Sequence, residues 1–168
     1  VVSDENYYGI YVNGSGNVAY NDTFINNEVG VYFAEQSSHN ILEESHVVNS
    51  TNFGIVVLGR NNEVEDSYVA STRVYDGVLV NGTDNLVAGS TLTGNGFFGI
   101  EIYGSGNLVN GSYLINNPAG ISLNGTYNTA ANLTISGSRW AGVYINYYSY
   151  HNTVEDSRIY NNQIGAYV

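Results

Sequence analysis

The chain repeats itself about every 22 residues, and this internal period constrains its fold more than any other feature. A glycine followed by alternating aliphatic, aromatic or polar residues recurs from one end of the chain to the other. The recurring glycines are Gly9, Gly30, Gly54, Gly77, Gly99, Gly120, Gly142 and Gly165. Because the residues after each glycine alternate, the pattern indicates a short β-strand with one inward and one outward face.

A second landmark is an asparagine that follows each of the first seven glycines after eight or ten residues. Apolar or small residues two and seven positions later, usually with a serine between them, predict two further short strands per repeat. We expect these asparagines to stack at one corner, where each amide binds the turn backbone and the asparagine of the next repeat. The predicted ladder consists of Asn17, Asn40, Asn62, Asn85, Asn107, Asn128 and Asn152.

Three short strands in about 22 residues cannot enclose a core alone, but stacking each strand on its counterpart in the next repeat can. A leucine-rich repeat would need its leucine consensus, and a propeller blade needs about 40 residues. The sequence therefore predicts an all-β parallel β-helix, a solenoid of about seven coils, with residues 1–168 forming one domain. A partial second ladder is predicted after the third strand, at Asn26, Asn49, Asn116 and Asn161.

The rhythm GIxV…N-x-V…S-x-L-x-N resembles the right-handed parallel β-helix repeat of pectate lyases, alginate epimerases, NosD-type periplasmic proteins and archaeal surface proteins. The resemblance covers essentially the whole chain and is closest to the NosD-like and archaeal surface arrays, because the repeats are regular and little interrupted. It implies a right-handed solenoid. It implies no single function, since this fold carries lyases, hydrolases, epimerases, adhesins and spacers.

The composition narrows the choice of partners. The net charge is −11, with 15 Asp and Glu residues against four basic residues, all arginine. Such a surface repels phosphates and anionic lipid heads, so nucleic acid and membrane surfaces are expected to be poor partners. The chain has no cysteine, hence no disulfide or thiolate metal site, and no apolar run long enough to insert into a membrane. It also has no methionine, so we expect a processed chain or part of a longer array.

Paired carboxylates suggest a cation site. Glu43 and Glu44 occupy the same phase of one repeat as Glu65 and Asp66 in the next, so the four carboxylates are predicted to stack close together. Oxygen ligands of this kind suit Ca²⁺. The alternative is a solvated acidic ridge that aids solubility.

A second acidic pair and the histidines were weighed for chemistry. Glu101 is predicted on the outward face of a first strand, with Asp76 just before the glycine one coil earlier. A glycosidase would need their carboxyl groups at a defined separation, and no arginine or lysine flanks them, so no catalytic residue is assigned. His39 and His151 lie in coils about five apart, too far to share a metal, so a copper role rests on the NosD resemblance alone.

Tyrosines are predicted to line the outer face of the first strands. Tyr11 and Tyr32 share the outward position in adjacent coils, and Tyr144 and Tyr167 repeat this near the other end. Tyr147 and Tyr148 follow in the turn of the last full coil, with Trp140 just before its glycine. Exposed rings of this kind suit sugar stacking or a protein contact, or they simply stabilise the sheet.

Seven Asn-x-Ser/Thr sequons favour a glycosylated protein that is extracellular or on the cell surface. The alternative is that the repeat is simply rich in these residues. The sequons lie at Asn13, Asn21, Asn49, Asn81, Asn110, Asn124 and Asn132.

The ends of the repeat array show no predicted cap. We therefore expect the chain to stack end to end with copies of itself, as in a filament, sheath or surface layer, or to continue into flanking repeats. This extracellular structural protein is the leading interpretation, because coils of 21 to 24 residues leave no long insertions to build an active-site groove. The alternatives are a secreted carbohydrate-binding or polysaccharide-degrading protein, of lyase or glycoside hydrolase type if an enzyme, and a NosD-like periplasmic accessory protein.

Overall fold

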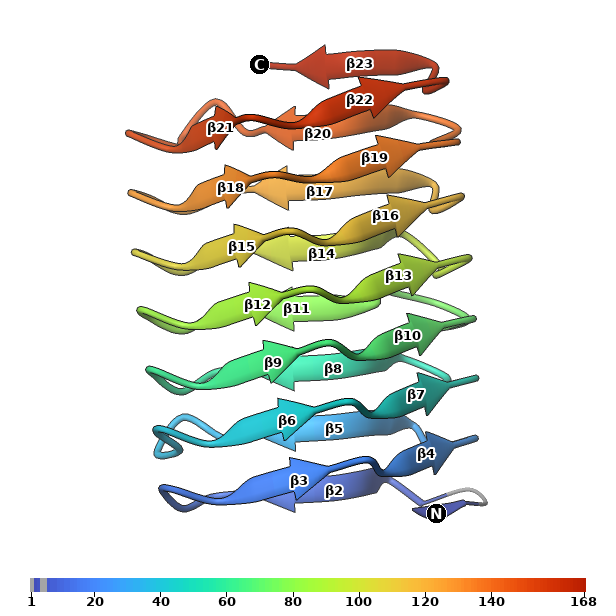
Figure 1. Ribbon diagram of the computed structural model, residues 1–168, viewed down its shortest axis with the longest axis vertical. Helices are drawn as coiled ribbons and strands as arrows, with labels where there is room; N and C mark the ends of the chain where they lie inside the picture. Colours follow the sequence, from blue (N-terminus) through green and yellow to red (C-terminus); the bar gives the residue numbers. More distant parts are fainter. Residues whose placement is uncertain (1, 4–5) are drawn as a thin grey trace.

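A computed structural model describes residues 2–3 and 6–168, which form 23 short strands (Figure 1). The first sheet contains the strands that carry the recurring glycine. They are β2 (Tyr8–Val12), β5 (Val29–Phe33), β8 (Phe53–Val57), β11 (Val78–Val80), β14 (Phe98–Ile102), β17 (Ala119–Leu123), β20 (Ala141–Ile145) and β23 (Ile164–Tyr167).

The second sheet follows the ladder asparagines, and the third sheet completes each coil. The second consists of β3 (Val18–Tyr20), β6 (Ile41–Glu43), β9 (Glu63–Glu65), β12 (Leu86–Ala88), β15 (Leu108–Asn110), β18 (Thr129–Ala131) and β21 (Thr153–Glu155). The third consists of β1 (Val2–Ser3), β4 (Thr23–Ile25), β7 (His46–Val48), β10 (Tyr68–Ala70), β13 (Thr91–Thr93), β16 (Tyr113–Ile115), β19 (Thr134–Ser136) and β22 (Arg158–Tyr160).

All pairing is parallel and joins each strand to its counterpart one coil away, which confirms the predicted right-handed solenoid of about seven coils. No helix long and apolar enough to cross a membrane occurs in the described part of the chain. The inward residues of the first sheet form a continuous column, in which Ile55, Val78, Ile100 and Ile121 are register partners and fully buried. Burying each such side chain contributes roughly 1.5–3 kcal/mol, so the repeat stabilises itself by stacking.

The predicted asparagine ladder is confirmed at the corner between the first and second sheets. In a representative coil, the Asn85 backbone N–H and side-chain Nδ2 both donate to Asn107 Oδ1, at 2.9 and 3.1 Å. Asn85 Nδ2 also donates to the carbonyl oxygen of Gly59, at 3.0 Å. The ladder therefore satisfies polar backbone groups that the solenoid buries at this corner.

The predicted second ladder is wrong by one residue. Asn26, Asn49, Asn116 and Asn161 adopt positive φ angles between 54° and 58°, and their side chains are exposed or half-buried. The buried ladder is formed by the residues that follow, as where Asn95 Nδ2 donates to Asn117 Oδ1 at 3.0 Å. Asparagine tolerates the left-handed conformation at the corner, and this turn directs the next side chain inward.

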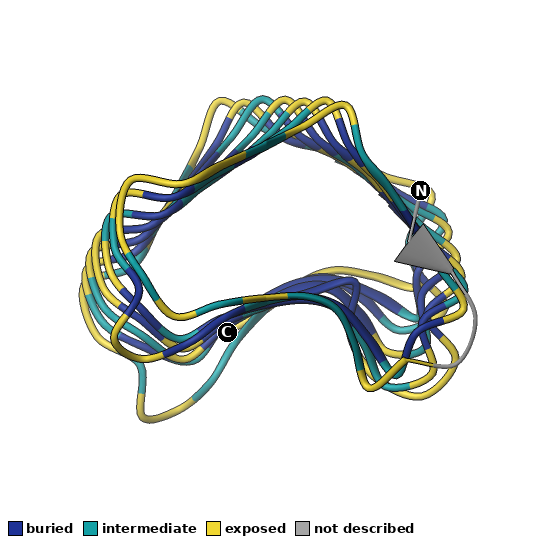
Figure 2. Cartoon of the chain, turned by 90° about the horizontal axis from the view of Figure 1, so that it is seen from below, coloured by how far each residue is buried: buried dark blue, intermediate teal, exposed yellow. Residues whose placement is uncertain are grey.

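The cross-section of the solenoid is not convex all round. Figure 2 shows that the wall made by the first sheet bows inward, while turns protrude at both of its edges. The backbone of the first sheet therefore forms the concave wall of the solenoid.

Candidate functional site

Two tyrosine pairs mark the ends of the outer face of the first sheet. The rings of Tyr11 and Tyr32 stack with centroids 5.4 Å apart and planes at 9°, and those of Tyr144 and Tyr167 stack at 5.4 Å and 21°. The predicted adjacency of these rings is confirmed. Between the pairs, the same outward position holds Val56, Leu79, Glu101 and Ser122.

The two carboxyl groups of Asp76 and Glu101 meet on this face. Asp76 is only 3% exposed, and its Oδ1 accepts a hydrogen bond from the Phe98 backbone N–H at 2.9 Å. The side chains of Asp76 and Glu101 are hydrogen-bonded to each other. Carboxyl groups in direct contact are closer than the separation of about 5 Å that a retaining glycosidase uses, so this pair lacks the spacing of a hydrolytic site.

Burial makes the pair share a proton. It raises the pKa of Asp76 to about 7, against the lowering effect of the Phe98 N–H, and the negative charge of Glu101 raises it further. Burial also raises the pKa of Glu101, while hydrogen bonds from Tyr103, Asp76 and Asn124 oppose that rise. Near neutral pH the first proton therefore resides on Asp76, which donates it to the Glu101 carboxylate.

Glu101 connects the pair to a groove at the corner between the first and second sheets. Asn124 Nδ2 donates to Glu101 Oε1 at 2.9 Å, and the Tyr103 hydroxyl is also hydrogen-bonded to Glu101. Both Asn124 and Tyr103 line the groove, which has a volume of 660 Å³. A change at the buried carboxyl pair therefore reaches the groove through two direct contacts.

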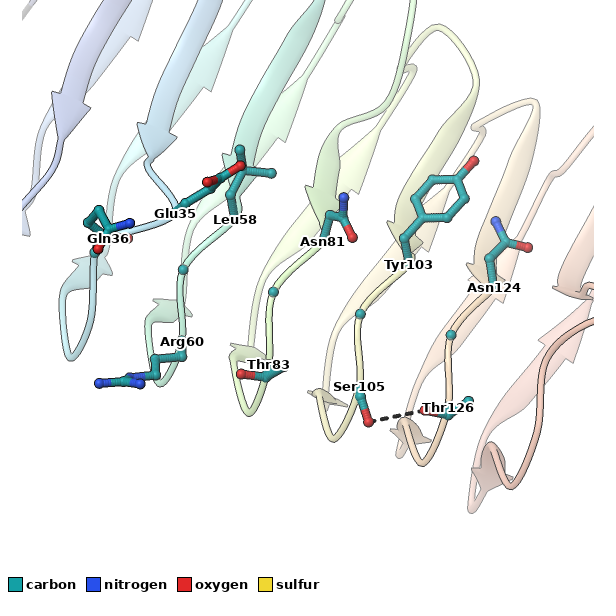
Figure 3. Close-up of a pocket in the computed structure, with 15 residues that line it drawn as sticks. Glu35, Gln36, Leu58, Arg60, Asn81, Thr83, Tyr103, Ser105, Asn124 and Thr126 are labelled. Atoms are coloured by element: carbon teal, nitrogen blue, oxygen red, sulfur yellow. Dashed lines mark hydrogen bonds between the residues drawn. The ribbon is translucent and has the colours of Figure 1, made fainter.

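The groove crosses four regular coils between two rows of side chains (Figure 3). One row contains Leu58, Asn81, Tyr103 and Asn124, and the other contains Arg60, Thr83, Ser105 and Thr126. Glycines lie between the rows because a Cβ there would collide with the backbone of the preceding coil, as a Cβ on Gly104 would with the Gly82 carbonyl oxygen. Amide and hydroxyl groups thus recur once per coil, at a spacing of about 4.8 Å.

Longer turns flank these regular coils on both sides. Glu35 and Gln36 form one of them and line the end of the groove, while Tyr147 and Tyr148 form the other and are 88% and 74% exposed. In these two coils the ladder asparagine follows its glycine after ten residues instead of eight. This longer spacing between glycine and asparagine marks the two coils that flank the groove. Total coil lengths, on which the sequence prediction relied, do not reveal it.

An aromatic ridge lies along the opposite edge of the same face. Tyr75, Phe97 and Trp140 each precede the strand glycine by two residues, and Pro118 occupies that position between the last two. The rings of Phe97 and Trp140 are parallel, with centroids 6.2 Å apart and planes at 8°. The sequence prediction included Trp140 but missed Tyr75 and Phe97, although their phase relative to the glycine could have identified them.

Of the four predicted Ca²⁺ ligands, the structure places Glu43 beside Glu65. Glu43 and Glu65 are register partners on the outer face of the second sheet. Burial, and then the charges of Glu63 and Glu43, raise the pKa of Glu65. Within residues 2–3 and 6–168, no three His, Cys, Asp or Glu side chains are grouped so that they could hold a metal ion. The Ca²⁺ site at Glu43, Glu44, Glu65 and Asp66 stays a prediction.

None of the seven sequon asparagines is fully buried. Asn13, Asn21, Asn81 and Asn132 are exposed, and the remaining three are half-buried. Asn124 is engaged with Glu101, and Asn132 Nδ2 donates to Asn110 Oδ1 at 2.9 Å. Glycosylation at these positions stays a prediction.

Comparisons with known proteins agree with the solenoid. Residues 54–168 match the right-handed beta helix region family, and residues 1–96 match the family of the periplasmic copper-binding protein NosD. No curated protein sequence matches the chain. Among solved structures, the periplasmic alginate epimerase AlgG is similar, with a TM-score of 0.66 and 22% identity over 84% of this chain and 36% of the epimerase.

The pectate lyase Pel9A is also similar, with a TM-score of 0.62 and 16% identity over 92% of this chain and 55% of the lyase. This chain thus spans about a third to a half of the length of these two enzymes. At these identities the likeness establishes the shared fold and nothing about the chemistry.

Proposed function

Since this chain belongs to the right-handed beta helix region family and, over residues 1–96, to the NosD family, its function has to be argued from its outer surface, and we propose that it binds a neutral glycan outside the cytoplasm. The observation that carries the proposal is the inward-bowed first sheet (Figure 2), with the aromatic ridge along one edge and the polar groove along the other (Figure 3).

The two edges offer complementary contacts to a sugar chain. In the aromatic ridge, the Tyr75 and Phe97 rings are exposed and the Trp140 ring is half-buried. Such rings present flat apolar surfaces on which the C–H faces of sugar rings stack. The groove presents the Asn81 amide and the Thr83 and Ser105 hydroxyls, which can each donate and accept hydrogen bonds with sugar hydroxyls. Because these groups recur with the coil spacing, an extended chain of similar units can lie along the solenoid axis.

Charge selects a neutral glycan over an acidic one. The protein carries a net charge of −11, and the side chains that line the groove include one cation, Arg60, and one anion, Glu35. A polyuronate would be repelled by the whole-molecule field, whereas a neutral, hydroxyl-rich chain is not. The location outside the cytoplasm is supported by the NosD family match and by the periplasmic location that is stated for AlgG.

Replacing Trp140 by alanine is expected to weaken glycan binding at least tenfold, because the largest ring of the aromatic ridge is lost. The matched control is Tyr113→Ala, which removes a half-exposed ring from β16 on the third sheet and leaves binding unchanged. Affinity electrophoresis against neutral and uronate polysaccharides, followed by calorimetry with the best ligand, measures both. Equal losses in the two variants, or preferential binding of uronates, would contradict the proposal.

End-to-end assembly is a second candidate, favoured by the state of the core at its ends. Ile10, Val12 and Ala19 at one end, and Val154 and Ile159 at the other, are only partly buried although they pack against the core. We propose that a further coil covers these residues, supplied by a second copy of this chain or by flanking repeats of a longer one. Because contacts between copies are head to tail, they produce filaments.

The expected result is a molar mass that rises with protein concentration in light scattering, with filaments in micrographs. A charge at the end of the core, as in Ile10→Asp, should abolish that growth, whereas Tyr113→Asp on a lateral face should not. A monodisperse monomer over a hundredfold range of concentration would rule out assembly, and it would leave glycan binding unaffected.

A further inference from the structure

Of the carboxyl pair, Asp76 is too enclosed to touch a ligand directly, whereas Glu101 is half-buried. Asp76 is 3% exposed and does not line the groove. The two hydrogen-bond partners of its carboxyl group, the Phe98 N–H and the Glu101 carboxyl group, belong to the neighbouring strand β14. Burying an acidic group this deeply costs free energy unless a proton or a partner compensates for its charge. The charge of this buried acidic group therefore has to be compensated by a proton or by a neighbouring group.

Among the residues that the structure describes, no basic group acts on the pair. On the outer face, β11 presents Leu79 and β8 presents Val56 beside the pair. On the other side, β17 presents Ser122 and β20 presents Tyr144. The titratable groups that act on the pair are the two carboxyl groups themselves and the Tyr103 hydroxyl. A shared proton is thus the compensation that the surroundings provide.

Glu101 also holds two side chains of the groove wall in place. Its carboxylate accepts hydrogen bonds from Asn124 Nδ2, at 2.9 Å, and from the Tyr103 hydroxyl. Asn124 Oδ1 and Ser122 Oγ are buried atoms without a hydrogen-bond partner in this arrangement. Asn124 and Tyr103 are also hydrogen-bonded to each other. Glu101 is the group that ties both of them to the buried carboxyl pair, so movement of Glu101 would release them together from that pair.

We propose that Asp76 and Glu101 are positioning residues, and that the proton they share holds the groove wall in the shape that binds the glycan. This inference rests on the proposed function and specifies how that site is regulated. With the proton present, Asp76 donates to Glu101, and Glu101 holds Asn124 and Tyr103. Without it, two adjacent negative charges repel, Glu101 swings away from Asp76, and the wall loses its two anchors.

The direction of the pH dependence follows from the proposal that the protonated form of the carboxyl pair is the one that binds the glycan. Glycan binding is strong below about pH 7, where the proton is present, and weakens as the pH rises through that value. We expect at least a tenfold lower affinity at pH 8.5 than at pH 5.5. The isosteric variant Asp76→Asn keeps an acceptor for the Phe98 N–H and supplies a permanent N–H donor to Glu101. Its affinity should be the same at both pH values.

Two controls separate the pair from general charge effects. Glu101→Gln retains an acceptor for Asn124 and a donor to Asp76, so its binding should also lose the pH dependence. Glu65→Gln removes another carboxylate of raised pKa, which lies on the second sheet and outside the groove. That variant should keep the pH profile of the wild type.

A measurement without glycan keeps this inference distinct from the proposed function. Carboxyl-carbon and Asn side-chain amide NMR signals should change together near pH 7 in the wild type and stay constant in Asp76→Asn. Trp140, the single tryptophan, packs on Phe98 with centroids 6.1 Å apart, so its fluorescence should report the same transition.

Glycan binding that is equal at pH 5.5 and 8.5 in the wild type would overturn the inference and leave the proposed function intact. Failure to bind any neutral glycan at either pH would overturn the proposed function. In that case, an Asn124 amide signal that changes through pH 7 would still support positioning by the carboxyl pair, and a constant signal would refute it.

Discussion

Replacing Asn107 by alanine is expected to lower the free energy of unfolding by about 4 kcal/mol, because several buried polar groups lose their partners at once. Asn107 is 2% exposed. Its Nδ2 donates to the Gly82 carbonyl oxygen at 3.1 Å and to Asn128 Oδ1 at 3.0 Å. Its Oδ1 accepts from the backbone N–H and the Nδ2 of Asn85, at 2.9 and 3.1 Å. Alanine can replace none of these bonds.

The loss is measured by chemical denaturation monitored by circular dichroism. The matched control is Asn81→Ala in the preceding coil, whose exposed side chain makes no hydrogen bond to another described residue. That substitution should change the free energy of unfolding by less than about 0.5 kcal/mol. If Asn107→Ala cost no more than this control, the ladder would be a consequence of stacking instead of a cause of stability.

The second large effect is a loss of stability as the pH rises, which we assign to Asp76. Its pKa is raised from 3.8 to about 7 by burial and by Glu101. An acid whose pKa is higher in the folded chain stabilises the fold fully below its unfolded pKa, and that contribution is lost as the pH rises through the folded value. A shift of about three units corresponds to up to about 4 kcal/mol between pH 4 and pH 8.

Asp76→Asn isolates this contribution from the other acidic groups of the chain. The variant should be more stable than the wild type at pH 8 by up to about 4 kcal/mol, and the difference should vanish near pH 4. Asp156→Asn, which neutralises an exposed carboxylate on a terminal coil, serves as the control and should show no such divergence. Parallel stability profiles for the wild type and Asp76→Asn would show that Asp76 is not held protonated in the fold.

Much of the solenoid could be predicted from the sequence because the number of residues in one coil is determined by its three strands and their turns. A coil of three short strands needs about 22 residues, and the corner residues have to tolerate sharp turns, so glycine and asparagine recur in phase. The stacks of Tyr11 on Tyr32 and of Tyr144 on Tyr167 follow from the same phase. The second ladder was misplaced by one residue because asparagine serves both as a turn residue and as a ladder residue, and the pattern alone does not separate these roles.

The sequence by itself determined the repeat, the strand faces and the asparagine ladder, since each depends on the position of a residue within its own coil. Only the tertiary structure decided that the first sheet bows inward, that Asp76 and Glu101 touch, and that the groove opens beside them. These features depend on the directions of side chains from neighbouring coils and on two turns that are each two residues longer than the others. The regular coil length had argued against a groove. Adjacent coils nevertheless form one together, because the glycines at its base carry no side chains that would fill it.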